Sequence, residues 1–161
     1  MARKYMPWYV YTCEGYGLGR LPVAPGTWGS LGATILYSGG YKVLPVWMLG
    51  LLTGLLLVGS IPLCNWASLY LAQQDPRNVI LDEIVGQWIA LFPLFWFPHW
   101  PHSIWAGFLA GFFCFRVFDV LKIFPINYLQ NLKGGWGIVM DDVLAGAFAN
   151  GTLFLTALYV L

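Results

Sequence analysis

Apolar residues form long runs in this chain, and polar residues collect in the short segments between them. Four such runs cover 43–72, 84–97, 102–121 and 138–161. An α-helix needs about 20 apolar residues to cross a bilayer. An earlier apolar piece, 27–37, is too short to cross alone, and Ser38-Gly39-Gly40 is expected to end it. The pattern predicts an all-α fold: a polytopic integral membrane helical bundle with about three to five spans and a short or re-entrant first helix.

Composition supports a membrane protein with one domain. Of the 161 residues, 59% are hydrophobic and only 9% are charged, whereas a soluble domain usually carries about 25% charged residues. So few charges cannot cover a water-facing surface, so we expect a single membrane-embedded domain over 1–161. The net charge of +1 gives no reason to expect a nucleic-acid partner. The bilayer and its lipids are the expected partners.

The charged residues are predicted to gather on one side of the membrane. If each apolar piece carries the chain across at least in part, segments 1–26, 73–83 and 116–137 share one side with the start of the last helix. All seven acids fall there: Glu14, Asp75, Asp82, Glu83, Asp119, Asp141 and Asp142. Seven of the eight bases do so too: Arg3, Lys4, Arg20, Arg77, Arg116, Lys122 and Lys133. The positive-inside rule makes this side cytoplasmic. Lys42, His99 and His102 belong to the other side, and neither histidine is expected to be a ligand or a base.

Three groups of acids on this charged side are candidates for metal chemistry. Asp82 and Glu83 begin an apolar helix, and Asp141 and Asp142 open the last span. Asp119 lies between Arg116 and Lys122 at a spacing of three residues, which places the three on one helical stripe. Each group alone also fits an ordinary charged helix end. Together they predict a carboxylate cage, and oxygen-only ligands suit Mg²⁺ or Mn²⁺ rather than zinc.

A possible anion site precedes the first helix. The run Ala24-Pro25-Gly26-Thr27 leads into that helix with Thr27 as candidate N-cap, and its first N–H groups could bind phosphate. A plain turn is the alternative reading, which this segment alone favours. The charged side carries neither a histidine nor a Cys-x5-Arg cradle. A metal-activated water is therefore the simplest nucleophile for phosphoryl transfer here.

Four ordered blocks of the sequence resemble the phosphatidylglycerophosphatase A family. They are GYGLG with PVAPGTWGS (residues 15–30), LDEIVGQWI (81–89), FRVFDVLK with PI (115–126) and GGWGIVMDDVLAG (134–146). The resemblance implies a bacterial inner-membrane enzyme whose active site faces the cytoplasm. Such an enzyme would hydrolyse phosphatidylglycerophosphate to phosphatidylglycerol and phosphate with Mg²⁺. One departure is Ile123, which stands where the family usually has proline after its lysine, and which should relax the helix end there.

The resemblance also implies site residues, carried over as Asp82, Glu83, Asp119, Lys122, Asp141 and Asp142. We expect Asp119, Asp141 and Asp142 to hold Mg²⁺ with Glu83 or Asp82, and the remaining acid of that pair to orient or deprotonate water. Phosphate oxygens would contact Lys122 and Arg116, with Arg20 as a further candidate. Backbone N–H groups at Gly26 and Thr27 would bind the same phosphate.

Two other functions remain open from the residues alone. Transfer of a phospho-alcohol onto a lipid nucleotide also uses membrane-surface acids and Mg²⁺, but its longer Asp-rich motif is absent from this sequence. A small membrane cation carrier or channel subunit could use the same acids as an ion site. Transport predicts acids near the bilayer midplane and on both sides of it.

Overall fold

The computed structural model describes residues 5–98, 100 and 103–160; Arg3, Lys4, His99 and His102 therefore lie outside the described residues. The described part of the chain contains helices and no strand. The elements are α1 (Trp8–Cys13), η1 (Gly15–Arg20), α2 (Pro25–Val43), α3 (Val46–Leu71), α4 (Leu81–Leu91), η2 (Phe92–Phe95), α5 (Ile104–Leu121), α6 (Ile126–Leu129) and α7 (Gly135–Val160). The predicted all-α class is confirmed.

Three of the described helices are long and apolar enough to cross a membrane: α3, α5 and α7. Their outward side chains include exposed apolar residues such as Leu55, Leu109 and Leu155, as expected of surfaces that face lipid. The remaining predicted run, 84–97, forms α4, whose 11 residues measure about 16 Å at the usual rise of an α-helix. A short 3₁₀ turn, η2, follows it, so this run crosses only part of a hydrocarbon core about 30 Å thick.

The helix predicted over residues 27–37, which is α2 in the structure, is longer than the sequence predicts. α2 continues for 19 residues through Ser38-Gly39-Gly40 and ends at Val43. Tyr37 is fully buried, and Tyr41 packs against Phe95, so tertiary packing outweighs the weak helix propensity of the two glycines. The helix ends where Leu44 turns extended before Pro45, because a residue before proline is disfavoured in the α conformation.

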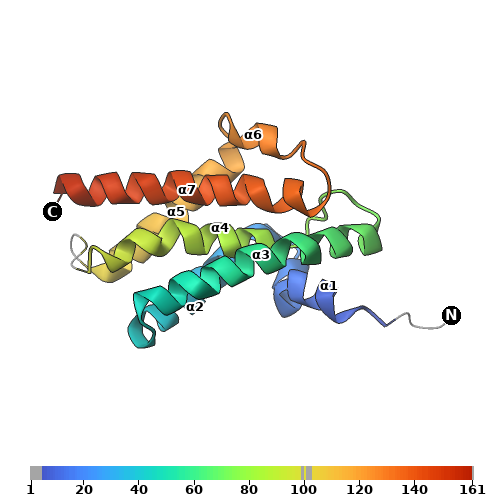
Figure 1. Cartoon of the computed structure of the whole chain (residues 1–161), viewed down its shortest axis with the longest axis horizontal. Coiled ribbons are helices and arrows are strands. Elements are labelled where there is room, and N and C mark those ends of the chain that lie inside the picture. Colours follow the sequence, from blue (N-terminus) through green and yellow to red (C-terminus); the bar gives the residue numbers. More distant parts are fainter. Residues whose placement is uncertain (1–4, 99, 101–102, 161) are drawn as a thin grey trace.

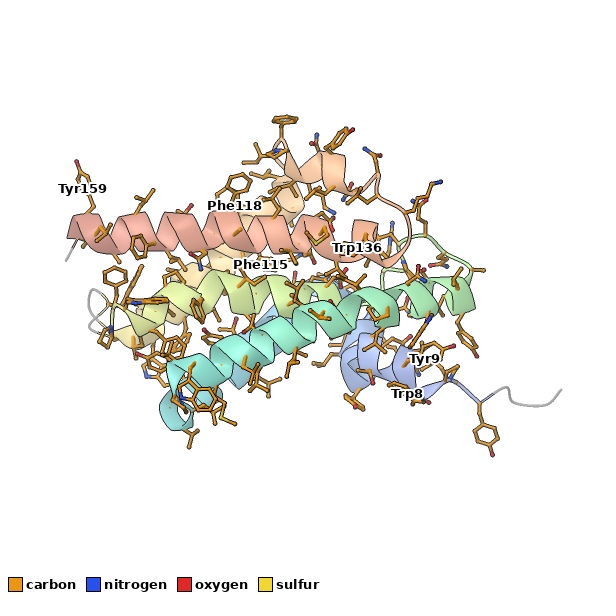
Figure 2. All side chains as sticks on the ribbon, viewed as in Figure 1. Trp8, Tyr9, Phe115, Phe118, Trp136 and Tyr159 are labelled. Carbon is orange, nitrogen blue, oxygen red and sulfur yellow. The ribbon has the colours of Figure 1, made fainter. Side chains whose placement is uncertain are left out.

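The helices are arranged along one long axis. Figure 1 shows α3, α4 and α7 running alongside one another, with the N-terminal segment at one end and the C-terminus at the other. Trp8, Tyr9 and Trp136 lie toward the N-terminal end in Figure 2, and Tyr159 lies at the opposite end. Aromatic residues at both ends are typical of the two membrane–water interfaces. We call the end that holds η1, the loop 72–80 and the starts of α4 and α7 the charged end.

A pair of glycines brings α4 and α7 into backbone contact. A methyl group added at Gly146 would collide with the carbonyl oxygen of Gly86. A methyl group at Gly86 would lie 2.5 Å from both the Asp142 carbonyl oxygen and the Phe115 ring, and Figure 2 shows Phe115 in the middle of the bundle. Small residues at a crossing allow membrane helices to approach closely. This glycine contact places the first turn of α4 next to the second turn of α7, where Asp142 lies.

The contact predicts an effect of Gly146→Ala on stability. The added methyl group must push α7 away from α4, which should lower the free energy of unfolding by about 1–3 kcal/mol. Gly151→Ala is the matched control, since a methyl group there meets no atom within 4 Å, and it should be neutral or slightly stabilising. Thermal unfolding in detergent micelles measures both. Equal melting temperatures for the two variants would contradict the close crossing.

Candidate functional site

The start of α4 is held in place by the N-terminal segment. The backbone N–H of Ile80, a fully buried residue, donates a 2.8 Å hydrogen bond to the carbonyl oxygen of Cys13 at the end of α1. The side-chain amide of Asn78 donates a 2.6 Å hydrogen bond to Oε1 of Glu14. These bonds fix the loop 72–80, and with it the point at which Asp82 and Glu83 enter the bundle.

Three carboxylates meet at the crossing of α4 and α7. One oxygen from each of Asp82, Glu83 and Asp142 lies within 4.8 Å of the other two. Asp82 and Asp142 are buried, and Asp82 Oδ1 and Glu83 Oε2 have no hydrogen-bond partner. Gly26 of α2 faces the same group, because a methyl group there would collide with Glu83 Oε1. We call Asp82, Glu83 and Asp142 the carboxylate triad.

The acids of the triad repel one another. Asp82 and Glu83 lie in the first turn of α4, outside the three candidate spans. Burial, together with the charge of Asp142, raises the pKa of Glu83 to about 8. Burial and the neighbouring Glu83 raise the pKa of Asp82 well above its ordinary value. Three close carboxylates with so little compensation favour either protonation or a bound cation.

The other two predicted ligands are paired with cations. Asp119 forms an ion pair with Arg116, one turn earlier on α5. Oδ2 of Asp141 accepts hydrogen bonds from Lys122 Nζ at 2.7 Å and from Gln130 Nε2 at 3.1 Å, whereas its Oδ1 has no partner. Lys122 caps α5 in the left-handed conformation, with φ 43°. α5 therefore ends just before the lysine, and Ile123 follows the helix rather than relaxing its last turn.

A cavity of about 270 Å³ opens onto these groups. Its lining comes from α2, the loop 72–80, α4, α5 and α7: Ala24, Pro25, Gly26, Asp75, Pro76, Arg77, Val79, Asp82, Glu83, Arg116, Lys122, Ile138, Asp141 and Asp142. Five of these residues are acids and three are bases. The cavity, which we call the carboxylate cavity, thus brings together all the predicted site residues except Asp119, Arg20 and Thr27.

The prediction that Thr27 is the N-cap of the first helix is wrong. Pro25 occupies the first position of α2, and Ala24 is the N-cap, in the left-handed conformation. Proline is favoured at this first position because its missing N–H would be unpaired there anyway. The N–H of Thr27 donates to the Ala24 carbonyl oxygen at 2.9 Å. Proline has no N–H and that of Thr27 is already bonded, so neither Pro25 nor Thr27 offers a free N–H to phosphate. Of the predicted anion loop, Ala24, Pro25 and Gly26 line the carboxylate cavity, and Thr27 does not.

Arg20 lies beside the carboxylate cavity rather than in it. Its Nε donates a 2.7 Å hydrogen bond to Oε2 of Glu14, whose side chain is only 2% exposed. This partner raises the pKa of Arg20. Arg20 lines a neighbouring cavity of about 510 Å³. Periodicity does not indicate that Glu14 is buried as its partner, since the two residues stand at opposite ends of an irregular 3₁₀ segment.

Two further polar groups belong to the site region and went unpredicted. Gln87 is fully buried, and neither atom of its side-chain amide has a hydrogen-bond partner. It lies one turn after Glu83 on the same face of α4. Its signal in the sequence is that it is the single strongly polar residue in the run 84–97. The sequence predicts Arg77, which lines both cavities, only as one of the seven bases on the charged side.

The triad fits a small divalent cation. All three donors are carboxylate oxygens, the ligands that Mg²⁺ prefers. Two oxygens bound to one octahedral Mg²⁺ are about 3.0 Å apart when adjacent and about 4.2 Å apart when opposite. The three triad oxygens lie within 4.8 Å of one another, so they would move inward to share one ion. The unpartnered oxygens of Asp82 and Glu83 are available for such a bond.

The chain is similar to known proteins over most of its length. The family model described as phosphatidylglycerophosphatase A matches residues 9–157. A Haemophilus influenzae protein named phosphatidylglycerophosphatase A is 36% identical over 91% of this chain and 87% of its own length. The Escherichia coli protein of the same name is 34% identical over 92% of this chain and 82% of its own length.

A third relative carries a different name. A Bacteroides thetaiotaomicron protein named "Putative phosphatidylinositol-3-phosphatase" is 39% identical over 84% of each chain. No solved structure matches the chain. The family model nevertheless spans almost all of it, including every residue of the carboxylate triad. On this match, and on the two relatives that bear the family's name, the chain belongs to the phosphatidylglycerophosphatase A family of phosphoric monoester hydrolases.

Proposed function

We propose that this chain hydrolyses the terminal phosphomonoester of phosphatidylglycerophosphate, with Mg²⁺ as cofactor, at the cytoplasmic face of a bacterial inner membrane. The products would be phosphatidylglycerol and inorganic phosphate. The observation that carries the proposal is the carboxylate triad, which shares one cavity with Arg116 and Lys122 at the charged end of the bundle. The family names of the relatives support the reaction.

Charge balance supports the cofactor. A phosphomonoester carries about two negative charges at neutral pH. A cavity with five acids and three bases would repel it. Asp82, Glu83 and Asp142 would hold Mg²⁺, with Asp141 Oδ1 as a further unpartnered donor. A bound Mg²⁺ supplies neutralisation of the phosphate charge and activation of a water nucleophile.

The remaining residues would bind the phosphate and move protons. Arg116 and Lys122 would neutralise its non-bridging oxygens, held in position by their ion pairs with Asp119 and Asp141. The water oxygen forms the new bond to phosphorus, and the bond from phosphorus to the glycerol oxygen breaks. The carboxylate oxygen of Asp82 or Glu83 that does not bind the metal would accept the proton that the water loses, and the departing glycerol oxygen would take up a proton from solvent to become a hydroxyl.

The location at the membrane surface also fits the substrate. Described acids gather at the charged end, where a lipid headgroup can reach them while its acyl chains stay in the bilayer. Transport across the membrane would call for acids along its depth. Among the described residues, no acid occurs in α3, in η2 or in the second half of α7. The carrier alternative therefore has no supporting observation.

Replacing the triad acids tests their role. Asp82→Asn and Asp142→Asn should each lower phosphate release from phosphatidylglycerophosphate by at least about 100-fold. Each variant removes a carboxylate charge that is proposed to hold the metal for the reaction. Asp119→Asn and Asp141→Asn should also abolish turnover by freeing Arg116 or Lys122. The assay uses purified protein in detergent, with and without Mg²⁺.

Asp75→Asn is the matched control for these variants. It makes the same chemical change in the same cavity, but at an exposed residue outside the triad. The loss of activity in Asp75→Asn should stay below about tenfold, the size expected for removal of an exposed charge. Equal losses at Asp75 and Asp142, or near-normal activity of Asp142→Asn in a folded protein, would refute the assigned roles.

Metal binding can be measured without turnover. Mg²⁺ at 100 times its dissociation constant should stabilise the folded protein by about 2.7 kcal/mol, because the ion binds only the folded state. The melting temperature in detergent should rise with Mg²⁺ and not with K⁺ at matched ionic strength. Asp142→Asn should remove most of the rise. A wild-type protein that gains no stability from any divalent cation would contradict the metal site.

A further inference from the structure

A second cavity adjoins the carboxylate cavity and has the opposite charge character. It measures about 510 Å³ and lies between η1 and the loop 72–80. Its lining residues are Gly19, Arg20, Leu21, Pro22, Ala24, Pro25, Arg77 and Asn78. Ala24, Pro25 and Arg77 line both cavities, so the two are neighbours. The second lining contains two arginines and no acid, whereas the first contains five acids.

Arg20, at one side of this cavity, is held in place by its buried partner Glu14. Arg20 pairs through Nε with Glu14, and the buried Glu14 also accepts the amide of Asn78. Gly19 packs so closely on the loop that a methyl group there would collide with the Asn78 carbonyl oxygen. The side chain of Arg20 remains about half exposed, at 48%. This arrangement holds a guanidinium at the cavity while its buried partner neutralises part of its charge.

Arg77 supplies the other cation. It is exposed, and it stands at the junction of the two cavities. Exposed apolar side chains lie close by along the chain, at Leu21, Val23 and Trp28. Cationic side chains next to exposed apolar ones are typical of protein surfaces that meet lipid headgroups. The cavity therefore has the charge and the surroundings to bind an anionic group that is attached to acyl chains.

We propose that Arg20 and Arg77 bind the phosphodiester of the lipid substrate while the carboxylate cavity receives its terminal phosphomonoester. This inference rests on the proposed function and extends it from the reacting phosphate to the rest of the headgroup. Phosphatidylglycerophosphate carries both groups on one glycerol. Phosphatidic acid carries only a monoester, bonded directly to diacylglycerol. The two adjoining cavities thus select lipids that have a diester as well as a monoester.

The kinetic test compares these two lipids in mixed micelles. Arg77→Gln should raise KM for phosphatidylglycerophosphate about tenfold, the usual scale for loss of one charge-assisted hydrogen bond, with little change in kcat. The KM for phosphatidic acid, or its inhibition constant where turnover is slow, should stay the same. Arg77→Lys should recover part of the loss. Lys133→Gln is the control, since it removes an exposed cation at the charged end that lines neither cavity.

Arg20 needs a paired change, because Arg20→Gln alone would leave the buried Glu14 without its cation. The double variant Glu14→Gln with Arg20→Gln removes both charges, and it should raise KM for phosphatidylglycerophosphate in the same selective way. Equal increases in KM for both lipids would overturn the inference, because the arginines would then act on the monoester. Equal effects of Arg77→Gln and Lys133→Gln would also overturn it, as a general surface charge effect.

A binding measurement separates this inference from the proposed function. Phosphatidylglycerol has the diester and no monoester, and its binding can be followed by tryptophan fluorescence with diacylglycerol as the phosphate-free reference. Wild-type protein should bind it about tenfold more tightly than Arg77→Gln. If wild-type protein released no phosphate from any lipid, the proposed function would fail while this binding difference still tested the diester site. Equal binding by the two proteins would overturn the inference even if hydrolysis occurred.

Discussion

The backbone contact between Gly86 of α4 and Gly146 of α7 determines how the site is built. It allows the two helices to approach until neither glycine could carry a side chain. Asp82 and Glu83 in the first turn of α4 and Asp142 in the second turn of α7 consequently share one small space. The N-terminal segment then fixes the position at which α4 begins, through the backbone hydrogen bond from Ile80 to Cys13. A looser crossing would leave the same acids as separate helix ends in the headgroup region.

This crowding has an electrostatic consequence that links the fold to the proposed chemistry. Close carboxylates destabilise one another, and burial adds to the effect at Asp82 and Glu83. The nearby cations are already engaged, Arg116 with Asp119 and Lys122 with Asp141. A divalent cation would relieve the repulsion within the triad and leave Arg116 and Lys122 facing a phosphate. The fold thus holds mutually repelling carboxylates at the place where we propose that a metal and an anion bind together.

The sequence predicted the parts of this arrangement that depend on composition and periodicity. Long apolar runs predicted α3, α5 and α7, and the positions of the acids between them predicted a common charged end. The meeting of Gly86 with Gly146 could not be predicted, because it depends on how two helices cross rather than on either helix. The same is true of the pairing of Arg20 with Glu14 and of the continuation of α2 through Gly39 and Gly40, which tertiary packing decides. Residue type alone favours Thr27 as the N-cap, but the proline two positions earlier starts the helix.

The most direct test of the central claim is an experimental structure of the protein with Mn²⁺ in place of Mg²⁺, read by anomalous scattering at the manganese edge. The account predicts an anomalous peak bonded to carboxylate oxygens of Asp82, Glu83 and Asp142, with α4 and α7 in contact at their glycines. A peak elsewhere, or a structure in which these three carboxylates lie too far apart to share an ion, would contradict it.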